Sequence, residues 1–268
     1  MCQIGLARRA HSGKSGAAVK AVLDGIGTLS YRCGVAGVFG RGLGDLVNDD
    51  RRWERYGALG GILFVVLVIA SIAVTGGNAK ASDSPGKILQ YFHDHQDGLR
   101  VGAFISVIAS VPIIWWAGSL WAYLARRGDR SHRLGLIAVL GLLIGGVGNL
   151  TQTGVNAAVA LELGRVSGVE AKFFFVMSQT LGAGGLVGLA VLVFAASIAG
   201  IRYDAFPRWI TWLGIVDGIV FVIAAATIAT TNDAIGAAAF AGFILWSIWL
   251  IATSVTMYRA TEDVAVLS

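Results

Sequence analysis

The residues that could carry out chemistry are few, and the densest group of them is the stretch YFHDHQD, residues 91–97. On a helix, His93 and Asp97 are four residues apart and share a face, as two ligands of one metal ion would. His95 points about 200° away from His93, so one ion cannot easily use both histidines. A catalytic zinc site needs three protein ligands. We therefore interpret the stretch as polar residues at a wet helix end, and keep His93 and Asp97 only as secondary candidates for metal ligands.

Asp217 is the stronger candidate for function because it lies deep within an apolar run. It comes eight residues after Trp209, where the run begins, so a helix would place it about 12 Å into a membrane. An unpaired charge at that depth costs several kcal/mol, so the carboxyl must be neutral, paired or facing water. Gly214 and Gly218 flank it and would let a second helix approach closely. Asp217 is thus a candidate for proton coupling, or else a hydrogen-bonded structural contact between helices.

A stripe of amide side chains offers neighbours for Asp217. Asn149, Gln152 and Asn156 follow one another at helical spacing, and Gln179 lies at a comparable depth in the next apolar run. With Asp217, these side chains would line a small polar cavity that binds an amide, a hydroxyl or a cation. As structure alone, they would be interhelical hydrogen bonds worth about 0.6–2 kcal/mol each. Both interpretations stay open.

Six long apolar runs must position these residues. Hydrophobic residues make up 56% of the chain and charged residues only 14%, whereas soluble domains carry about 25% charged residues. A helix needs about 20 apolar residues to cross a hydrocarbon layer of about 30 Å. The sequence therefore predicts an all-α membrane protein, a six-transmembrane-helix bundle. Its expected spans are residues 57–76, 99–124, 134–160, 173–200, 209–230 and 236–257.

The distribution of Lys and Arg predicts the orientation of the bundle. Nine of these residues precede the first span and four lie between the second and third spans, whereas the three loops on the opposite side together hold five. Because basic residues favour the cytoplasmic side, both termini are expected to be cytoplasmic. The net charge of +5 comes mostly from this bias. The expected partner is therefore the lipid bilayer and not nucleic acid.

The chain outside the spans divides into two segments. Residues 1–56 are expected to form a cytoplasmic N-terminal segment, disordered or loosely helical, and residues 259–268 a cytoplasmic tail after the transmembrane domain of residues 57–258. Val47 directly precedes NDDRRWERYG and would make a natural start, which leaves open whether residues 1–46 belong to the mature protein. Cys2 and Cys33 predict neither a disulfide framework nor a structural zinc site, which needs about four ligands.

The first external connection is expected to contain a short amphipathic helix. Ser84 and Pro85 make a good helix start, with Ser as the cap and Pro at the first helical position. Four apolar residues then fall on one side at helical spacing: Ile88, Leu89, Phe92 and Leu99. We expect this helix to lie at the outer membrane interface and to bend into the second span.

Two further expectations concern packing between spans. Gly184 and Gly188 form a G-x-x-x-G pair, with Gly182 and Gly185 close by, and such glycines are typical of closely packed membrane helices. Arg100, at the outer start of the second span, is expected to pair with Glu162 or Glu170.

Two short patterns resemble a known family. Ser84, Ile88, Tyr91 and His95 have the spacing S-x-x-x-I-x-x-Y-x-x-x-H, and residues 207–212 read P-R-W-x-x-W. In both, the chain resembles an uncharacterised family of six-span membrane proteins common in high-GC Gram-positive bacteria. The resemblance covers roughly residues 50–260 and implies a bacterial plasma-membrane protein. That family has no established activity, so the resemblance implies no functional residue and no cofactor.

Two classes of function follow from these residues. One is a small-molecule or proton-coupled permease that uses Asp217 with the amide stripe. The other is a non-catalytic assembly or partner-binding subunit, joined to a second copy or to another membrane protein. An enzyme comes third, because the sequence has no recognisable nucleophile–base pair, no HExxH, no cluster of catalytic acids and no intramembrane histidine pair for haem. No cofactor is predicted, and the ligand is not identified.

Overall fold

The computed structural model describes residues 35–77, 79–230 and 233–266, with side chains over 55–77, 79–230 and 235–260. The chain divides into two units, residues 1–48 and 49–268. The second unit holds all of the apolar helices found among the described residues. Of the expected N-terminal segment, residues 1–34 lie outside the described residues, and the first described helix begins at Val35.

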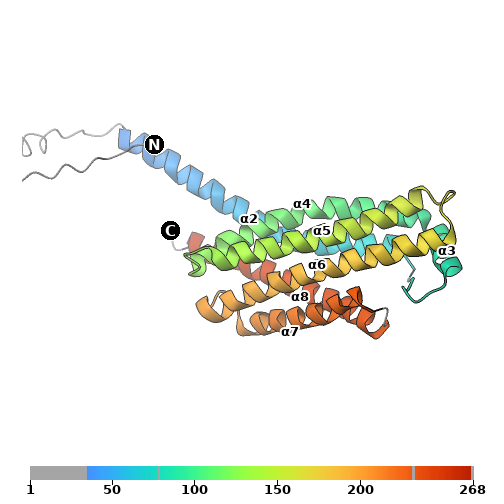
Figure 1. The fold of residues 1–268 in the computed structure, drawn as a ribbon. Coiled ribbons are helices and arrows are strands. Elements are labelled where there is room, and N and C mark those ends of the chain that lie inside the picture. The colour runs from blue at the N-terminus through green and yellow to red at the C-terminus, as the bar shows by residue number, and fades with distance from the viewer. Residues whose placement is uncertain (1–34, 78, 231–232, 267–268) are drawn as a thin grey trace, which may run out of the picture. The chain divides into compact units, whose positions relative to one another are not determined.

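Six of the described helices are long and apolar enough to cross a membrane (Figure 1). They are α2 (Val35–Thr75), α4 (Gln96–Arg127), α5 (Arg133–Leu161), α6 (Gly168–Tyr203), α7 (Arg208–Ala225) and α8 (Asp233–Val266). The apolar part of α2 is Arg55–Thr75, and α7 continues into the 3-10 turn η1 (Ala226–Ile228). The described residues contain no strand. The all-α fold with six membrane-length helices is therefore confirmed, while the side on which the termini lie stays a prediction.

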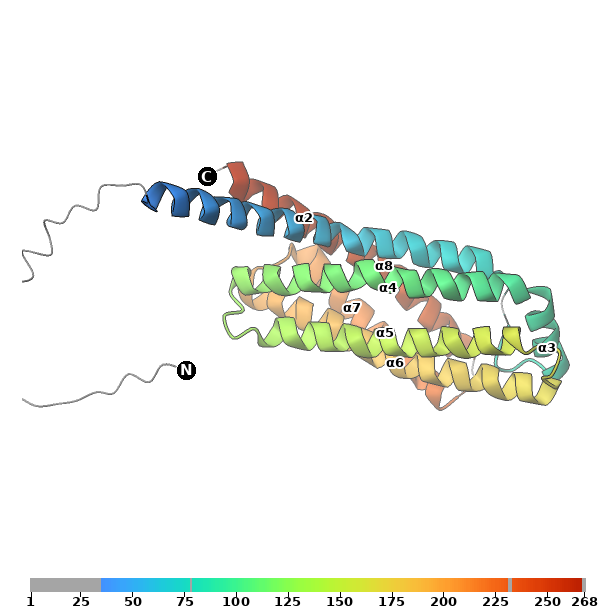
Figure 2. The same cartoon turned by 90° about the horizontal axis from the view of Figure 1, so that it is seen from above.

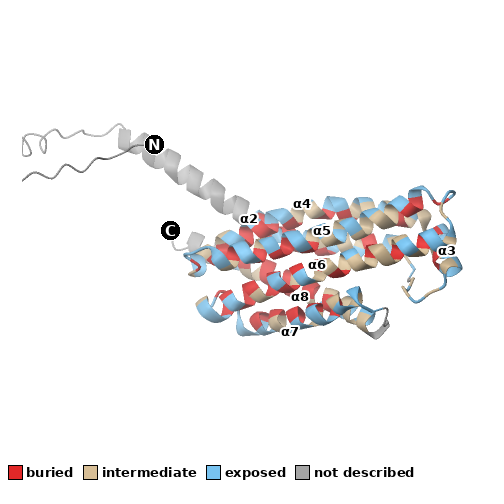
Figure 3. Cartoon of the chain, in the orientation of Figure 1, coloured by how far each residue is buried: buried red, intermediate tan, exposed pale blue. Residues whose placement is uncertain are grey.

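Helix α6 is the central helix of the bundle. In its most apolar window 56% of residues are buried, against 28–39% in the other five helices. It packs against α5 and against α7. On the outward faces of the helices, large apolar side chains such as Phe104, Ile114 and Leu143 are exposed (Figure 3). Apolar surface of this extent on several neighbouring helices suits contact with lipid tails and not with water.

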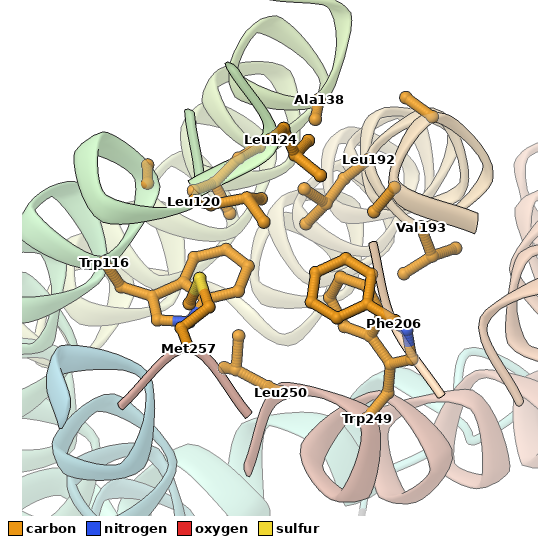
Figure 4. Packing of buried hydrophobic residues seen from close by; sticks show 14 of the residues in the cluster. Trp116, Leu120, Leu124, Ala138, Leu192, Val193, Phe206, Trp249, Leu250 and Met257 are labelled. Atoms are coloured by element: carbon orange, nitrogen blue, oxygen red, sulfur yellow. The ribbon is translucent and has the colours of Figure 1, made fainter. Parts of the chain in front are cut away.

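The larger apolar core lies toward the end of the bundle that holds the α4–α5 and α6–α7 connections. Trp116 of α4 and Trp249 of α8 meet edge to face, with ring centroids 6.1 Å apart (Figure 4). Leu192 of α6 and Leu250 of α8 are fully buried beside them. Such edge-to-face contacts add about 0.5–1.5 kcal/mol beyond burial, so this core fixes α4, α6 and α8 to one another.

Helix α4 continues without interruption through Pro112. Helix α2 packs beside this proline because Gly60 has no side chain. A Cβ added to Gly60 would lie 2.2 Å from the carbonyl oxygen of Pro112, and one added to Gly57 would lie 2.2 Å from the Ser119 hydroxyl. The two glycines therefore permit a backbone approach that a larger residue would block.

A short helix, α3 (Pro85–Asp94), covers the other end of the bundle (Figure 2). The Ser84 hydroxyl accepts a hydrogen bond from the Lys87 N–H, and Pro85 takes the first helical turn, as the sequence predicts. Ile88 and Phe92 are 0% exposed and pack on Phe175 and its neighbours from α5 and α6. The apolar face of α3 is thus directed at the bundle itself. That this end is the external one stays a prediction.

Candidate functional site

A cavity of about 560 Å³ opens between α5, α6, η1 and α8, beside the segment that joins α2 to α3. Small-molecule sites typically measure about 300–1,000 Å³. Apolar side chains, among them Val176, Leu186 and Phe240, form much of the wall. The polar side chains that line it are those of Lys80, Gln152, Gln179, Thr180, Thr227 and Thr230. The cavity is therefore apolar with a few polar groups, the usual character of a ligand site.

Two of the amides predicted from the sequence meet in this cavity. The Gln152 Nε2 of α5 donates a hydrogen bond of 2.9 Å to the Gln179 Oε1 of α6. A Cβ added to Gly182 would lie 2.2 Å from the Gln152 Oε1, so this glycine makes room for the amide. Gln152 and Gln179 are both half-buried. The amide pair thus stands in the wall with polar atoms still accessible.

Glycines set the close approach of α5 and α6 that brings this pair together. A Cβ added to Gly188 would lie 2.6 Å from the carbonyl oxygen of Gly141, and one added to Gly148 would lie 2.6 Å from the Cα of Gly185. An added Cβ at Gly184, in contrast, meets nothing within 4 Å. The prediction that both glycines of the G-x-x-x-G pair lie in a close helix contact is therefore wrong for Gly184 and confirmed for Gly188. The face of α6 toward α5 carries Gly185 and Gly188.

The other two amides of the predicted stripe do not line the cavity. Asn156 lies one turn of α5 beyond Gln152, and its Oδ1 accepts a hydrogen bond of 2.9 Å from the hydroxyl of Ser178 on α6. Asn149 is exposed, and its side-chain amide makes no hydrogen bond to the described residues, although its backbone carbonyl accepts one from the Thr153 hydroxyl. The stripe of α5 that faces α6 runs through Gly145, Gly148, Gln152 and Asn156. Asn149 lies about 100° to one side of Gly148 on a regular helix and so leaves that face.

Asp217 is fully buried in a different part of the bundle. Its exposed fraction is 0%, and neither carboxyl oxygen has a hydrogen-bond partner among the described residues. One turn away, a Cβ added to Gly214 would lie 2.4 Å from the Ser197 hydroxyl and 2.8 Å from the Trp249 Nε1. One added to Gly218 would lie 2.6 Å from the Phe194 ring. The two glycines therefore admit α6 and α8, as their spacing predicts for a neighbouring helix.

The structure separates Asp217 from the amide stripe. Helix α7 packs against α6 and α8, and α6 lies between it and α5. Thr227, which lines the cavity, is ten residues beyond Asp217, or about 15 Å along a helix. Phe221, 1% exposed and packed against Gly242, lies between the two levels. The expectation that the neighbours of Asp217 lie on the third span therefore does not hold.

Several other buried polar atoms lack partners among the described residues, and sequence reasoning missed them. They are the hydroxyls of Ser197 and Ser254 and the indole nitrogens of Trp116 and Trp246. A Cβ added to Gly61 would lie 2.3 Å from the Ser254 hydroxyl and 2.9 Å from the Trp116 Nε1, which places those two atoms close together. Single serines and tryptophans in apolar runs carry no pattern that distinguishes them from lipid-facing residues, so only the packing identifies them.

Lys80, which lines the cavity, lies beside three other charged residues. The Asp83 carboxylate accepts hydrogen bonds from the Lys87 Nζ at 2.6 Å and from the Lys80 backbone N–H at 2.9 Å. These two donors hold the pKa of the Asp83 carboxyl below its ordinary value of 3.8. The Lys172 Nζ of α6 donates to the Asp83 backbone carbonyl at 2.8 Å. Sequence reasoning did not single out any of these four residues as site residues.

The stretch of residues 91–97 forms the junction between α3 and α4. His93 lies in α3 and Asp97 in α4, with the helical pattern broken at His95, so the two do not share one helical face. His95 stacks on Tyr91, and its ring lies 2.8 Å from a Cβ added to Gly77, whose φ is +65°. The described residues contain no group of three or more His, Cys, Asp or Glu that could hold a metal ion. This histidine instead packs over the chain that leaves α2.

Arg100 lies beside this junction, with contacts other than those predicted. Its guanidinium donates to the Ala160 carbonyl at 3.0 Å and lies 3.7 Å from the Asp97 carboxylate. Glu162 pairs instead with Arg165, and Glu170 accepts from the Ser167 backbone N–H at the start of α6. The predicted pairing of Arg100 with Glu162 or Glu170 is therefore wrong. Both acids are satisfied locally at helix ends.

No protein-family model, no curated protein and no solved structure matches this chain. The resemblance to the six-span bacterial family therefore stays an expectation.

Proposed function

We propose that this protein is a membrane permease that takes a small polar molecule into the cavity lined by Gln152 and Gln179. Support comes from the cavity itself, which measures about 560 Å³, lies between α5, α6, η1 and α8 of the six-helix bundle, and has an amide pair in its wall. It lies at the end of the bundle that carries α3, which the charge bias predicts to be external. A solute would enter from that side. Because Asp217 lies outside the cavity, solute binding belongs to the amide pair and not to that carboxyl.

The amide pair suits recognition of a polar solute. A glutamine side chain offers one carbonyl acceptor and two N–H donors. The Gln152–Gln179 bond uses one donor and one acceptor, so the remaining N–H groups can bind a solute. A site that hydrogen-bonds its ligand discriminates strongly against analogues without the partner group, because its own polar atoms would then be left unpaired.

Filling the cavity tests this proposal. Gly236 lines the cavity, and a Cβ added there meets nothing within 4 Å, so Gly236→Trp should fold and occupy the space. Gly154→Trp is the matched control, because Gly154 also has open space but does not line the cavity. The screen uses a panel of amino acids, sugars, nucleosides and organic acids, and it selects compounds that raise the thermal midpoint of the wild-type protein in nanodiscs. Uptake of each selected compound is then measured in liposomes that contain the protein.

The expected result is that hits stabilise the wild type and Gly154→Trp but lose their effect on Gly236→Trp, and that uptake is lost in the same variant. If no compound stabilises the wild type, or if the effect survives in Gly236→Trp, the proposed site is wrong.

A second candidate function, a non-catalytic assembly subunit, is favoured by Asn149. This amide is exposed near the middle of α5 and makes no side-chain hydrogen bond to the described residues. Amides in apolar membrane surroundings bond across helices with about 0.6–2 kcal/mol, so a helix of another subunit could satisfy it. Under this alternative, Asn149→Leu abolishes co-purification of a partner or of a tagged second copy in mild detergent. Under the permease proposal, it leaves solute binding unchanged.

A further inference from the structure

Arginines gather at the end of the bundle opposite α3, on two connections that touch each other (Figure 1). The Tyr123 hydroxyl of α4 donates a hydrogen bond to the Ala205 carbonyl between α6 and α7. The Tyr203 ring lies 3.1 Å from a Cβ added to Gly128, at the end of α4. The arginines of the α4–α5 and α6–α7 connections and their helix ends therefore lie in one region: Arg126, Arg127, Arg130, Arg133, Arg202 and Arg208.

Four of these arginines have side chains without a partner among the described residues. They are Arg130, Arg133, Arg202 and Arg208, and all four are exposed. Arg127 lies over the Tyr123 ring, with 5.3 Å between its Cζ and the ring centroid, and Arg126 has a contact of its own. Only the four exposed arginines without partners are therefore available to a ligand.

The acids of these two connections do not cancel that charge. Asp129 is 1% exposed, and its carboxylate accepts hydrogen bonds from the Gly135 N–H at 2.9 Å and the Ser131 hydroxyl at 3.2 Å. Asp204 is exposed and does oppose the four arginines, which leaves 4 − 1 = +3 on this surface. Residues 49–55 and 259–263, next to the spans of α2 and α8, add four arginines and five acids, or 4 − 5 = −1. This end of the bundle therefore stays basic.

Helix α7 begins in this basic region with an uncapped N-terminus. Pro207 takes the cap position, no side chain caps the helix, and no described hydrogen bond uses the backbone N–H of Arg208 or Trp209. Such N–H groups and the positive end of the helix dipole bind anions. A phosphate at this helix start would meet backbone donors together with the Arg208 guanidinium, whose fork of N–H groups matches phosphate oxygens.

An apolar stripe leads away from this N-terminus along the outer face of α7. Its members are exposed and follow one another at intervals of three and four residues: Trp209, Trp212, Val216, Ile219 and Ile223. On a helix this spacing keeps them on one face. Trp209 and Trp212 are 58% and 64% exposed, and exposed tryptophans are enriched where lipid headgroups meet hydrocarbon. A phosphate at the start of α7 would thus have a surface for an acyl chain directly beside it.

We propose that the start of α7 is a binding site for an anionic phospholipid. Its phosphate is held by Arg208 and the arginines of the two connections, and an acyl chain lies along the stripe. The stripe favours a lipid over a dissolved phosphate, and the surplus of arginines favours an anionic headgroup over a neutral one. None of these residues lines the cavity, so this site and the proposed permease can be tested separately.

Titration of the full chain in mild detergent with dioctanoyl phosphatidylglycerol, followed by its thermal midpoint, tests this site. Dioctanoyl phosphatidylcholine is the matched lipid, because it has the same acyl chains and no net charge. Phosphatidylglycerol should raise the midpoint at a lower concentration than phosphatidylcholine does. Arg208→Gln should raise the half-saturating concentration of phosphatidylglycerol about fivefold. Asp204→Asn should lower it, because this variant removes the charge that opposes the arginines.

Arg259→Gln is the matched control variant, because Arg259 is exposed at the same end of the bundle but lies on α8, outside the two connections. It should change the half-saturating concentration much less than Arg208→Gln does. An equal change in both variants would mean that the charge acts diffusely, and would refute a site at the start of α7. If phosphatidylcholine stabilises the protein as well as phosphatidylglycerol, anion recognition is overturned. If glycerol phosphate stabilises it as strongly as the anionic lipid at equal concentration, the ligand is a dissolved phosphate and the lipid site is overturned.

Discussion

Replacing Gly188 or Gly184 by alanine places the same methyl group on the same helix, one turn apart, in opposite surroundings. At Gly188 the added Cβ would lie 2.6 Å from the carbonyl oxygen of Gly141 and 2.6 Å from the backbone nitrogen of Gly145. At Gly184 it would meet nothing within 4 Å. Backbone atoms cannot rotate aside as a side chain can, so Gly188→Ala must push α5 and α6 apart.

The expected difference can be worked from these contacts. Alanine in place of a helical glycine gains about 1 kcal/mol of helix propensity, and both variants share that gain. Overpacking costs about 1–3 kcal/mol, and Gly188→Ala alone incurs it. The two variants should therefore differ by about 2 kcal/mol, which corresponds to about 6 °C in thermal midpoint for a domain of this size. Gly184→Ala should unfold at or slightly above the wild-type temperature, and Gly188→Ala below it.

Thermal unfolding of the wild type and both variants in one detergent, followed by tryptophan fluorescence, measures this difference. The fully buried Trp116 and Trp249 give a signal that depends on the intact core. Equal midpoints, or a larger loss in Gly184→Ala, would refute the assignment of Gly188 to the interface between α5 and α6. The amide pair of the cavity would then lack the close helix contact that positions it.

Three other predictions follow from single side chains. Asp217→Leu should raise the thermal midpoint, because an apolar group of the same branching takes the place of a fully buried carboxyl that has no partner among the described residues. Such an unsatisfied polar group costs about 1–3 kcal/mol. A lower midpoint would mean that the carboxyl has a stabilising contact. The pKa of the Asp83 carboxyl is lower in the folded protein than its unfolded value of 3.8, so the ionised carboxylate stabilises the fold above that pH, and this stabilisation is lost as the pH falls through the folded pKa. As the pH is lowered, the thermal midpoint should therefore fall more steeply in the wild type than in Asp83→Asn. Parallel curves would contradict this. Phe92→Ala removes a ring that is 0% exposed and should cost about 3–5 kcal/mol, seen as faster hydrogen exchange across α3 than in the exposed-site control His93→Ala.

Local features of the sequence predicted the elements well. The start of α3 at Ser84 and Pro85 depends only on neighbouring residues, because the cap hydroxyl bonds a backbone N–H three residues away. The six membrane-length helices were predictable for a similar reason. A chain in hydrocarbon must satisfy its backbone hydrogen bonds within each segment, so length and apolar character suffice to define a span whatever its neighbours are.

The candidate site was predictable only in part. Gln152 and Gln179 were identified because amides in apolar runs are rare and their depths could be counted. Lys80 was not, because a lysine in a connecting loop resembles any solvated charge until the fold places it at a cavity. Asp217 was identified as buried, but the choice of its neighbours was wrong.

The sequence by itself thus determined that the chain is built from six apolar helices and at what depth each polar residue lies in them. Only the tertiary structure decided that α6 is central, that Gly185 and Gly188 rather than Gly184 face α5, and that Asp217 and the glutamine pair belong to separate places. The physical reason is that depth is counted along one helix, from residue spacing alone. The rotation of each helix about its axis and the choice of its neighbours depend on how side chains from several helices fill the space between them.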